Sequence, residues 1–482
     1  MRFTFYILIL CFFTSCSEKK TSTNNSNYSL QSAFLKDNNT TNPLIQGIWK
    51  SIGNGYYLEA RTDSILLYSY TDSFCYKEKN DYLEGLLNSQ SQFTIHEDTL
   101  GIYLTDFGDK TQILQTKKAF IKVSHLPENR IGFSELTNLG SDELFKLYIE
   151  TMQENYAFSE RRNLNWKSLM ASYKDSVTSG DEALFNTMGK IATLTKDQHT
   201  KVISETGKTL QYRITPSAEI VKEVFEEQSE IKDLNKYFNL FFSTNYTNIT
   251  DSLLQGNGQK VANDKVEWGQ LTEDIGYINI HSFRGFLGKE FTRKQQIDSL
   301  NVVMQNIIEI FQDKDAIVVD ISFNFGGYDA AALTIASYFT DIPVLSHTSH
   351  VFNNNSFYEE DQVIVYPADS KTFTKPVYLL MTDISRSAAE SFAMMMGALP
   401  NVKLIGSNTL GTLSGMLGKS IGGFYTTYSN QKLVDINGRF FEVSGVEPDI
   451  ELKVFRKEDI FQSHKTAVID LIKMIEENKN SR

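Results

Sequence analysis

The spacing of apolar and polar residues changes along the chain and divides it into segments. Between residues 44 and 132, short stretches such as Tyr56–Leu58 and Ile65–Tyr70 are rich in apolar and aromatic residues, and turn sequences such as Gly53-Asn54-Gly55 separate them. Short alternating stretches between turn signals are typical of strands that bury one face. We therefore predict a small β-rich domain over residues 44–132.

A helical period replaces this alternation over residues 135–200, where apolar residues recur three or four positions apart. They are Leu144, Leu147, Tyr148 and Met152 in one predicted helix, and Leu184, Met188 and Ile191 in another. This spacing predicts a small bundle of about three helices that ends at Lys196–Thr200. The connecting segment, residues 201–265, is predicted to hold one helix, Ala218–Phe242, followed by a polar loop.

From residue 266 onward, continuous apolar strands alternate with helical stretches. The predicted strands are Gly276–Ile280, Ala316–Ile321, Val377–Met381 and Val402–Ile405, and the helices are Asp329–Phe339 and Ser387–Leu399. Aromatic strands at Phe424–Tyr428 and Leu433–Phe441 and a closing helix at Lys465–Glu476 follow. Buried strands that alternate with helices indicate an α/β core over residues 266–482, with a mixed sheet and crossover helices.

The first residues have the pattern of an export signal. Arg2 is positive, Phe3–Phe13 is apolar but too short to span a bilayer, and Thr14-Ser15 precede Cys16. Phe13-Thr14-Ser15-Cys16 resembles a bacterial lipobox, which implies that residues 1–15 are removed and Cys16 is lipidated. Residues 16–43 are mostly polar and predict a flexible tether. We therefore expect an exported protein, lipid-anchored in the bacterial cell envelope on the periplasmic or outer face; an ordinary signal peptide is the alternative.

Charge and cysteine content narrow the function. The formal net charge is −12, and no long basic run is present, so a nucleic-acid partner is not expected. The other cysteines are Cys11, inside the signal, and Cys75. If Cys16 is acylated, Cys75 has no disulfide partner, and this scatter gives no zinc-binding spacing.

The strongest candidate for chemistry is Ser387, at the junction of a predicted strand and a predicted helix. Helix N-terminal amides favour developing negative charge, and the end of the strand brings the side chain to the rim of the sheet. Ser387 and Glu390 also fit Ser-x-x-Glu, a capping box that merely satisfies helix amides. These residues alone leave both interpretations open.

Three further positions are candidates, each with an ordinary structural alternative. Gly326-Gly327 follow a buried strand directly, and could present backbone N–H groups or simply form a turn. His199 lies in a polar loop where a histidine is usually a surface residue. Glu442 lies near a predicted strand end, where a solvated turn is the alternative.

Together, these segments resemble one superfamily: the C-terminal-processing and tricorn-type serine peptidases, which also include the interphotoreceptor retinoid-binding proteins. The matching motifs occur in the family's order. They are Asp-x-His-Thr at Asp197–Thr200, Asn-x-Gly-Gly at Asn324–Gly327, Ser-Ala-Ala-Glu at Ser387–Glu390, Gly-x-x-Thr-x-Gly at Gly406–Gly411 and Gly-Val-x-Pro-Asp at Gly445–Asp449. The resemblance implies a crotonase-like, ClpP-type core and hydrolysis of peptides or unfolded protein segments.

The resemblance also implies roles for individual residues. Ser387 would be the nucleophile, with an oxyanion hole formed by the N–H of Ala388 and by one glycine of Gly326-Gly327. A Ser–Lys enzyme would carry Lys in Thr-x-Gly-Lys, where this chain has Thr409-Leu410-Gly411-Thr412. The chain therefore resembles the tricorn-like branch, in which His199 would be the general base and Glu442 would assist it. No metal or cofactor is implied.

Two alternatives remain open from the sequence. Retinoid-binding members of the superfamily carry apolar ligands, so a binding protein without catalysis is one, and the 33 Phe and 23 Tyr could line a cavity. A Ser–Lys peptidase that uses Lys419 is the other. Residues 201–265 lack the glycine-rich carboxylate-binding loop of a PDZ domain, so we do not expect substrate selection through such a domain.

Overall fold

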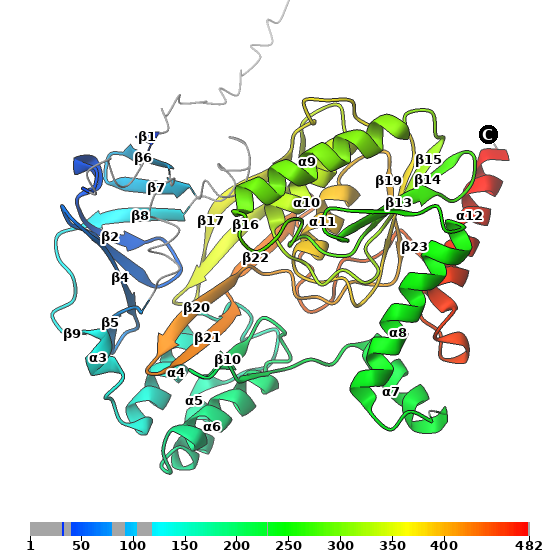
Figure 1. Cartoon of the computed structure of the whole chain (residues 1–482). Coiled ribbons are helices and arrows are strands. Elements are labelled where there is room, and N and C mark those ends of the chain that lie inside the picture. The colour runs from blue at the N-terminus through cyan, green and yellow to red at the C-terminus, as the bar shows by residue number, and fades with distance from the viewer. Residues whose placement is uncertain (1–30, 33–39, 80–91, 104–117, 229, 481–482) are drawn as a thin grey trace, which may run out of the picture.

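A computed structural model describes residues 31–32, 40–79, 92–103, 118–228 and 230–480 (Figure 1). The predicted signal, Cys16 and most of the predicted tether lie outside these residues. Within the described part of the chain, no helix is both long enough and apolar enough to cross a membrane.

The N-terminal β-rich segment forms one sheet in the order β1-β6-β7-β8-β2-β3-β4-β5-β9. Its strands are β1 (Gln31–Ser32), β2 (Gly47–Ser51), β3 (Tyr56–Ala60), β4 (Ile65–Tyr70), β5 (Cys75–Lys77), β6 (Gln92–His96), β7 (Thr99–Tyr103), β8 (Lys118–Val123) and β9 (Arg130–Ile131). Alternate residues such as Trp49, Leu58 and Phe93 pack into a buried core on one face. Strands β3 and β4 coincide with the apolar stretches Tyr56–Leu58 and Ile65–Tyr70, whereas β1 lies within residues 16–43, where a tether was predicted.

The helical segment holds the predicted helices and joins the α/β core through a small sheet. The helices are α3 (Phe133–Leu136), α4 (Ser141–Asn155), α5 (Trp166–Tyr173) and α6 (Asp181–Leu194). The sheet has the order β11-β10-β21-β20, from β10 (Lys201–Ile203), β11 (Thr209–Gln211), β20 (Met416–Ile421) and β21 (Phe424–Ser429). Because β10 pairs with β21, the turn that ends the bundle is fixed against the C-terminal part of the chain.

The prediction of one helix at Ala218–Phe242 is wrong. The chain forms two helices, α7 (Pro216–Gln228) and α8 (Leu234–Asn248). Asp233 begins the second, because its carboxylate accepts hydrogen bonds from the N–H groups of Asn235 and Lys236 at 2.9 and 3.2 Å. An N-terminal cap of this kind breaks a helical pattern that apolar spacing alone would continue.

The centre of the molecule is a sheet in the order β12-β13-β14-β15-β18-β19-β23. Its strands are β12 (Gln259–Val261), β13 (Val266–Gln270), β14 (Ile275–Ile280), β15 (Ala316–Asp320), β18 (Val377–Met381), β19 (Val402–Gly406) and β23 (Ile450–Glu451). From β14 to β23 neighbouring strands run parallel, and β12 and β13 are antiparallel. This confirms the mixed α/β fold.

Helices cover both faces of this sheet (Figure 1). Helices α9 (Arg293–Ile310), α10 (Asp329–Ala336) and α11 (Ala388–Gly397) pack on one face, and α7, α8 and α12 (Ser463–Asn480) on the other. Strands β14, β15 and β18 are buried along their whole length. Their carboxyl ends lie at one edge, where ligand sites of such sheets form.

A third small sheet has the order β17-β16-β22, from β16 (Val344–Asn353), β17 (Ser356–Val365) and β22 (Gln431–Asp435). The predicted strand Leu433–Phe441 is wrong in extent, because Asp435 accepts hydrogen bonds from the N–H groups of Asn437 and Arg439 and turns the chain. Short helical turns are η1 (Pro43–Ile45), η3 (Lys174–Ser176), η4 (Ile249–Leu253), η5 (Ser337–Phe339) and η6 (Lys457–Asp459).

Candidate active site

Ser387 occupies a sharp turn between β18 and α11. Its backbone has φ 57° and ψ −126°, values that a residue with a side chain rarely adopts. Such a conformation persists only where its surroundings impose it. The Ser387 N–H donates to the Thr412 carbonyl and to a Glu390 carboxylate oxygen, at 3.1 Å each. The turn therefore holds a half-buried serine at the carboxyl edge of the sheet, as a nucleophile elbow does.

The two nearest serines are committed to other contacts. Ser385 is fully buried, and its hydroxyl donates to the Ile321 carbonyl at 2.8 Å. Ser391 is buried one turn further along α11, where its hydroxyl is bonded to the Asp329 carboxyl. Of the three serines, only Ser387 is partly accessible.

Glu390 does more than cap the helix. Its buried carboxylate accepts hydrogen bonds from the Thr409 hydroxyl at 2.6 Å, from the Gly411 N–H at 2.7 Å and from the Thr412 N–H at 2.8 Å, besides the Ser387 N–H. Burial raises the pKa of Glu390 to about 7, against these hydrogen bonds. The Glu390 N–H donates to the Ser387 carbonyl at 2.7 Å and not to its hydroxyl. The capping interpretation thus explains the Glu390 carboxylate but leaves the Ser387 hydroxyl uncommitted within the described residues.

Gly326 packs directly against the turn. A Cβ at this position would lie 2.8 Å from the Ser387 Cβ and 3.0 Å from the Ala388 nitrogen, and its φ of 88° also favours glycine. The Gly326 N–H itself donates to the Asn324 side-chain oxygen at 2.8 Å. Gly326 therefore allows the close approach of the two backbones, while its own amide is occupied.

The Gly327 and Ala388 amides are the better oxyanion donors. Gly327 pairs with Phe283 in an isolated parallel bridge, in which Phe283 bonds to the carbonyl of Gly326 and to the N–H of Tyr328. The bridge therefore leaves the Gly327 N–H unused, and neither this group nor the Ala388 N–H has an acceptor within the described parts of the chain. Two such amides beside a serine can stabilise a tetrahedral oxyanion.

His199 lies in the turn between α6 and β10. The backbone N–H of His199 donates to the Asp197 carboxylate at 2.8 Å, and its backbone carbonyl accepts from the Thr427 hydroxyl at 2.7 Å. The ring is buried, and its Nδ1 has no partner among the described residues. Burial lowers the pKa of His199 to about 4, although the nearby Asp197 carboxylate opposes the shift. At neutral pH the imidazole is therefore uncharged and able to accept a proton.

The turns that hold His199 and Ser387 are in direct contact. The Arg386 guanidinium donates a hydrogen bond to the Gln198 side-chain oxygen, and Arg386 is close enough to the His199 ring to help lower its pKa. No hydrogen bond joins the His199 ring to the Ser387 hydroxyl in the described structure. Catalytic hydrogen bonds of substrate-free enzymes are often long and tighten only with substrate.

Glu442 is buried beside the same turn. One carboxylate oxygen accepts from the N–H groups of Leu413 and Ser414 at 2.9 and 3.0 Å, and the other lies 3.6 Å from an Arg162 guanidinium nitrogen. Burial raises the pKa of Glu442 well above its ordinary value, the Asp197 carboxylate adds to the shift and Arg162 opposes it. The Ser414 backbone also contacts the His199 ring. Glu442 and His199 thus share neighbours without a direct hydrogen bond in the described structure.

Two residues of this cluster were missed as functional candidates. Asp197 organises the turn, because its second oxygen accepts from the Thr200 hydroxyl at 3.1 Å; the Asp-x-His-Thr motif contained this signal. Arg162 donates to the carbonyls of Thr195 and Lys196 at 3.1 and 2.8 Å, besides its contact with Glu442. Nothing in the local sequence marks Arg162.

Lys419 has a different location. Its buried amino group donates to the carbonyl of Gly55 at 2.7 Å and to that of Tyr70 at 3.4 Å, and lies 4.9 Å from the centre of the Tyr56 ring. It therefore fastens the N-terminal sheet to β20. This arrangement argues against the alternative in which Lys419 activates Ser387.

Comparison with known proteins places this site in a family. Residues 274–452, which include Ser387, the two glycines and Glu442 but not His199, match the model of peptidase family S41. A crystal structure of a candidate peptidase from Parabacteroides merdae is similar in fold, with a TM-score of 0.56, 22% identity and coverage of 70% of this chain and 97% of that one.

Two other solved structures are more distant. Mature CPAF complexed with lactacystin has a TM-score of 0.48 and 11% identity, covering 71% of this chain and 98% of that one. The tricorn protease has a TM-score of 0.37 and 12% identity, covering 87% of this chain and 44% of that one. The α/β core and the family match define a serine-type peptidase. The match to the S41 family covers residues 274–452, the part of the chain that holds Ser387.

Proposed function

We propose that the protein hydrolyses peptides or unfolded protein segments through an acyl-enzyme on Ser387. The observation that carries this proposal is the strained, half-buried Ser387 beside the uncommitted N–H groups of Gly327 and Ala388. A serine whose hydroxyl has no hydrogen-bond partner among the described residues, and which lies beside two backbone donors, meets the main requirement of acyl transfer.

In the proposed reaction, the Ser387 oxygen attacks the carbonyl carbon of the scissile amide while His199 takes the hydroxyl proton. The Gly327 and Ala388 amides stabilise the resulting oxyanion. His199 then protonates the leaving amine as the C–N bond breaks, and water hydrolyses the ester by the same route. Glu442 assists as a positioning residue through the segment around Ser414, in the manner of the tricorn-like branch.

Labelling with a fluorophosphonate probe tests the nucleophile. We expect one adduct in the wild type, mapped to Ser387, and none in Ser387→Ala. The matched control is Ser391→Ala, one helical turn away, which should keep the label. An adduct at Ser385 or Ser391 would contradict the assignment, and a folded wild type without any adduct or peptide cleavage would favour the non-catalytic binding protein.

We further propose that Cys16 is lipidated and anchors the exported enzyme in the bacterial cell envelope, on the evidence of the Phe13–Cys16 sequence. Metabolically supplied palmitate should label the wild type and not Cys16→Ser. Cys75→Ser is the control that should keep the label. Equal labelling of Cys16→Ser and the wild type would exclude the anchor.

A further inference from the structure

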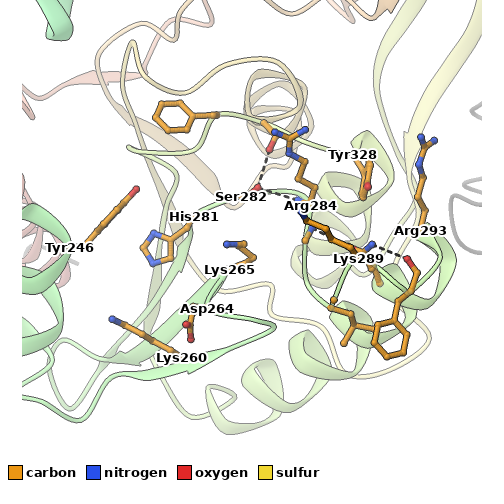
Figure 2. Close-up of a pocket in the computed structure, with 17 residues that line it drawn as sticks. Tyr246, Lys260, Asp264, Lys265, His281, Ser282, Arg284, Lys289, Arg293 and Tyr328 are labelled. Carbon is orange, nitrogen blue, oxygen red and sulfur yellow. Dashed lines mark hydrogen bonds between the residues drawn. The ribbon is translucent and has the colours of Figure 1, made fainter. Parts of the chain in front are cut away.

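A large pocket adjoins the candidate oxyanion hole. It has a volume of about 830 Å³, and Phe325 and Gly326 form part of its wall. Tyr246 of α8, His281 after β14 and the segment leading into α9 form other parts (Figure 2). Because Gly326 packs against Ser387, a peptide in this pocket would run directly to the nucleophile.

The pocket is basic although the protein is acidic. Its lining holds one acidic residue, Asp264, and five basic residues. The basic residues are Lys260, Lys265, Arg284, Lys289 and Arg293. The whole chain has a formal charge of −12, so positive charge is concentrated here against the overall balance. We call this hollow the basic pocket.

Most of this charge is not neutralised by the protein. Within the residues that the structure describes, Lys265, Arg284 and Lys289 form no ion pair with a carboxylate. Figure 2 shows these three side chains around the same hollow. By contrast, Lys294 of α9, which is not part of the pocket lining, pairs with Asp298 at 2.6 Å. The basic pocket therefore offers several charged donors for an anion.

Positively charged residues also lie next to the candidate nucleophile. Arg386, next to Ser387, has its pKa lowered mainly by burial and further by the charges of Arg213 and Arg284. Burial and the charges of Arg284, Arg213 and Arg386 also lower the pKa of Lys201. Placing like charges close together costs free energy, and a bound anion would offset that cost.

A second, smaller pocket shares Phe325 with the basic pocket and differs in chemistry. It has a volume of about 340 Å³, and its lining includes Phe238, Phe241 and Ile384. Phe325 lines both pockets, and Arg386 lines the smaller one, with its guanidinium 4.6 Å from the centre of the Phe325 ring. The surface around Ser387 is therefore not uniformly basic, and the basic pocket is a distinct feature of one side.

We propose that the basic pocket binds carboxylate groups of the peptide substrate, so that the enzyme prefers acidic peptides. This inference rests on the proposed peptidase function at Ser387. The carboxylates could belong to Asp and Glu side chains or to a free C-terminus, and both would make charge-assisted hydrogen bonds with Lys265, Arg284 and Lys289.

Internally quenched peptides of one sequence, blocked at both ends, can test the side-chain source. One peptide carries a Glu pair before the scissile bond, another carries it after the bond, and a third has Gln at both places. A fourth is the Gln peptide with a free C-terminal carboxylate. We expect kcat/KM for at least one carboxylate-bearing peptide to exceed that of the blocked Gln peptide about tenfold or more, the effect of one charge-assisted hydrogen bond.

The double variant Lys265→Gln/Arg284→Gln should reduce this ratio to near one. The control is Lys371→Gln, which also removes positive charge. Because Lys371 pairs with Glu309 on the surface, this variant should keep the wild-type ratio. Higher ionic strength should also lower the wild-type ratio, which gives a readout independent of any variant. Equal cleavage of all four peptides by the wild type would overturn the proposal, as would a preference that survives in the double variant.

The outcomes also separate the two proposals. If Ser387→Ala abolishes cleavage while no carboxylate preference exists, the peptidase function stands and the basic pocket does not select acidic peptides. If no peptide is cleaved and Ser387 takes no probe, the proposed function itself fails. A preference seen only for the free carboxylate would assign the pocket to the C-terminus of the substrate.

Discussion

The side-chain oxygen of Gln198 accepts a hydrogen bond from the guanidinium of Arg386, and so joins the residue before His199 to the residue before Ser387. The two turns come from distant parts of the sequence, and their contact is what brings the candidate base towards the candidate nucleophile. Positioning of this kind affects the rate strongly, because small displacements of reacting groups slow catalysis.

We therefore predict that Gln198→Ala lowers kcat about tenfold or more while KM changes little, since orientation matters most in the transition state. Gln198→Glu, which keeps an acceptor for Arg386, should restore most of the rate. Circular dichroism should show that both variants are folded. A loss of kcat that the acceptor variant does not rescue would mean that Gln198 acts only through the local packing.

Gly326 gives a sharper steric test. Gly326→Ala should reduce kcat by about two to three orders of magnitude, as loss of an oxyanion contact does, because the new Cβ would push on Ser387 and Ala388. The control is Gly140→Ala, where φ is −64° and the nearest atom to a new Cβ is 3.9 Å away. Active-site labelling and turnover of the two variants provide the measurement. Normal turnover of Gly326→Ala would exclude the proposed oxyanion geometry.

Lys419 should contribute to stability and not to chemistry. Lys419→Ala leaves the carbonyls of Gly55 and Tyr70 buried without their donor, so we expect a loss of about 3 kcal/mol in the free energy of unfolding. Denaturant titration measures this, and activity per folded molecule should stay near that of the wild type. A stable but inactive Lys419→Ala protein would instead revive the Ser–Lys mechanism.

The strands and the nucleophile turn were predictable from sequence because their signals are local. Val377–Met381 is a continuous apolar strand, and Ser387 directly precedes the next helix, so its position at the sheet edge follows from neighbouring residues. The long helix α9 and the strands β16 and β17 were not predicted. Helix α9 has polar residues between its buried ones, so its apolar pattern is less evident in the sequence.

The assembly of the site was not predictable from local patterns. Arg162 and Glu442 meet only because the helical segment packs against the C-terminal loops. Likewise, the basic residues of the pocket are spread from Lys260 to Arg293 in the sequence, and no run of charge reveals them. The family resemblance supplied His199 and Glu442 as candidates, whereas burial and the contacts of their neighbours needed the structure.

The pH dependence of the reaction can identify the base. An unperturbed histidine has a pKa near 6.5, but burial lowers that of His199 to about 4. A base must be deprotonated to act, so kcat/KM should rise as pH increases through about 4 and should already be level by neutral pH. An ordinary histidine would give a later rise, and a lysine base a much later one.

His347 provides the matched control, because burial lowers its pKa to about 4 as well. It lies on β16, where its ring is bonded to the Ser346 hydroxyl at 2.9 Å. His199→Ala should lose about two to four orders of magnitude in kcat and should lack the acid limb, the rise of kcat/KM through about pH 4. His347→Gln should keep the wild-type kcat and the acid limb. Circular dichroism across the same pH range separates titration from acid unfolding. An acid limb that persists in His199→Ala and vanishes in His347→Gln would remove His199 from the mechanism, since the titrating group would then lie on β16.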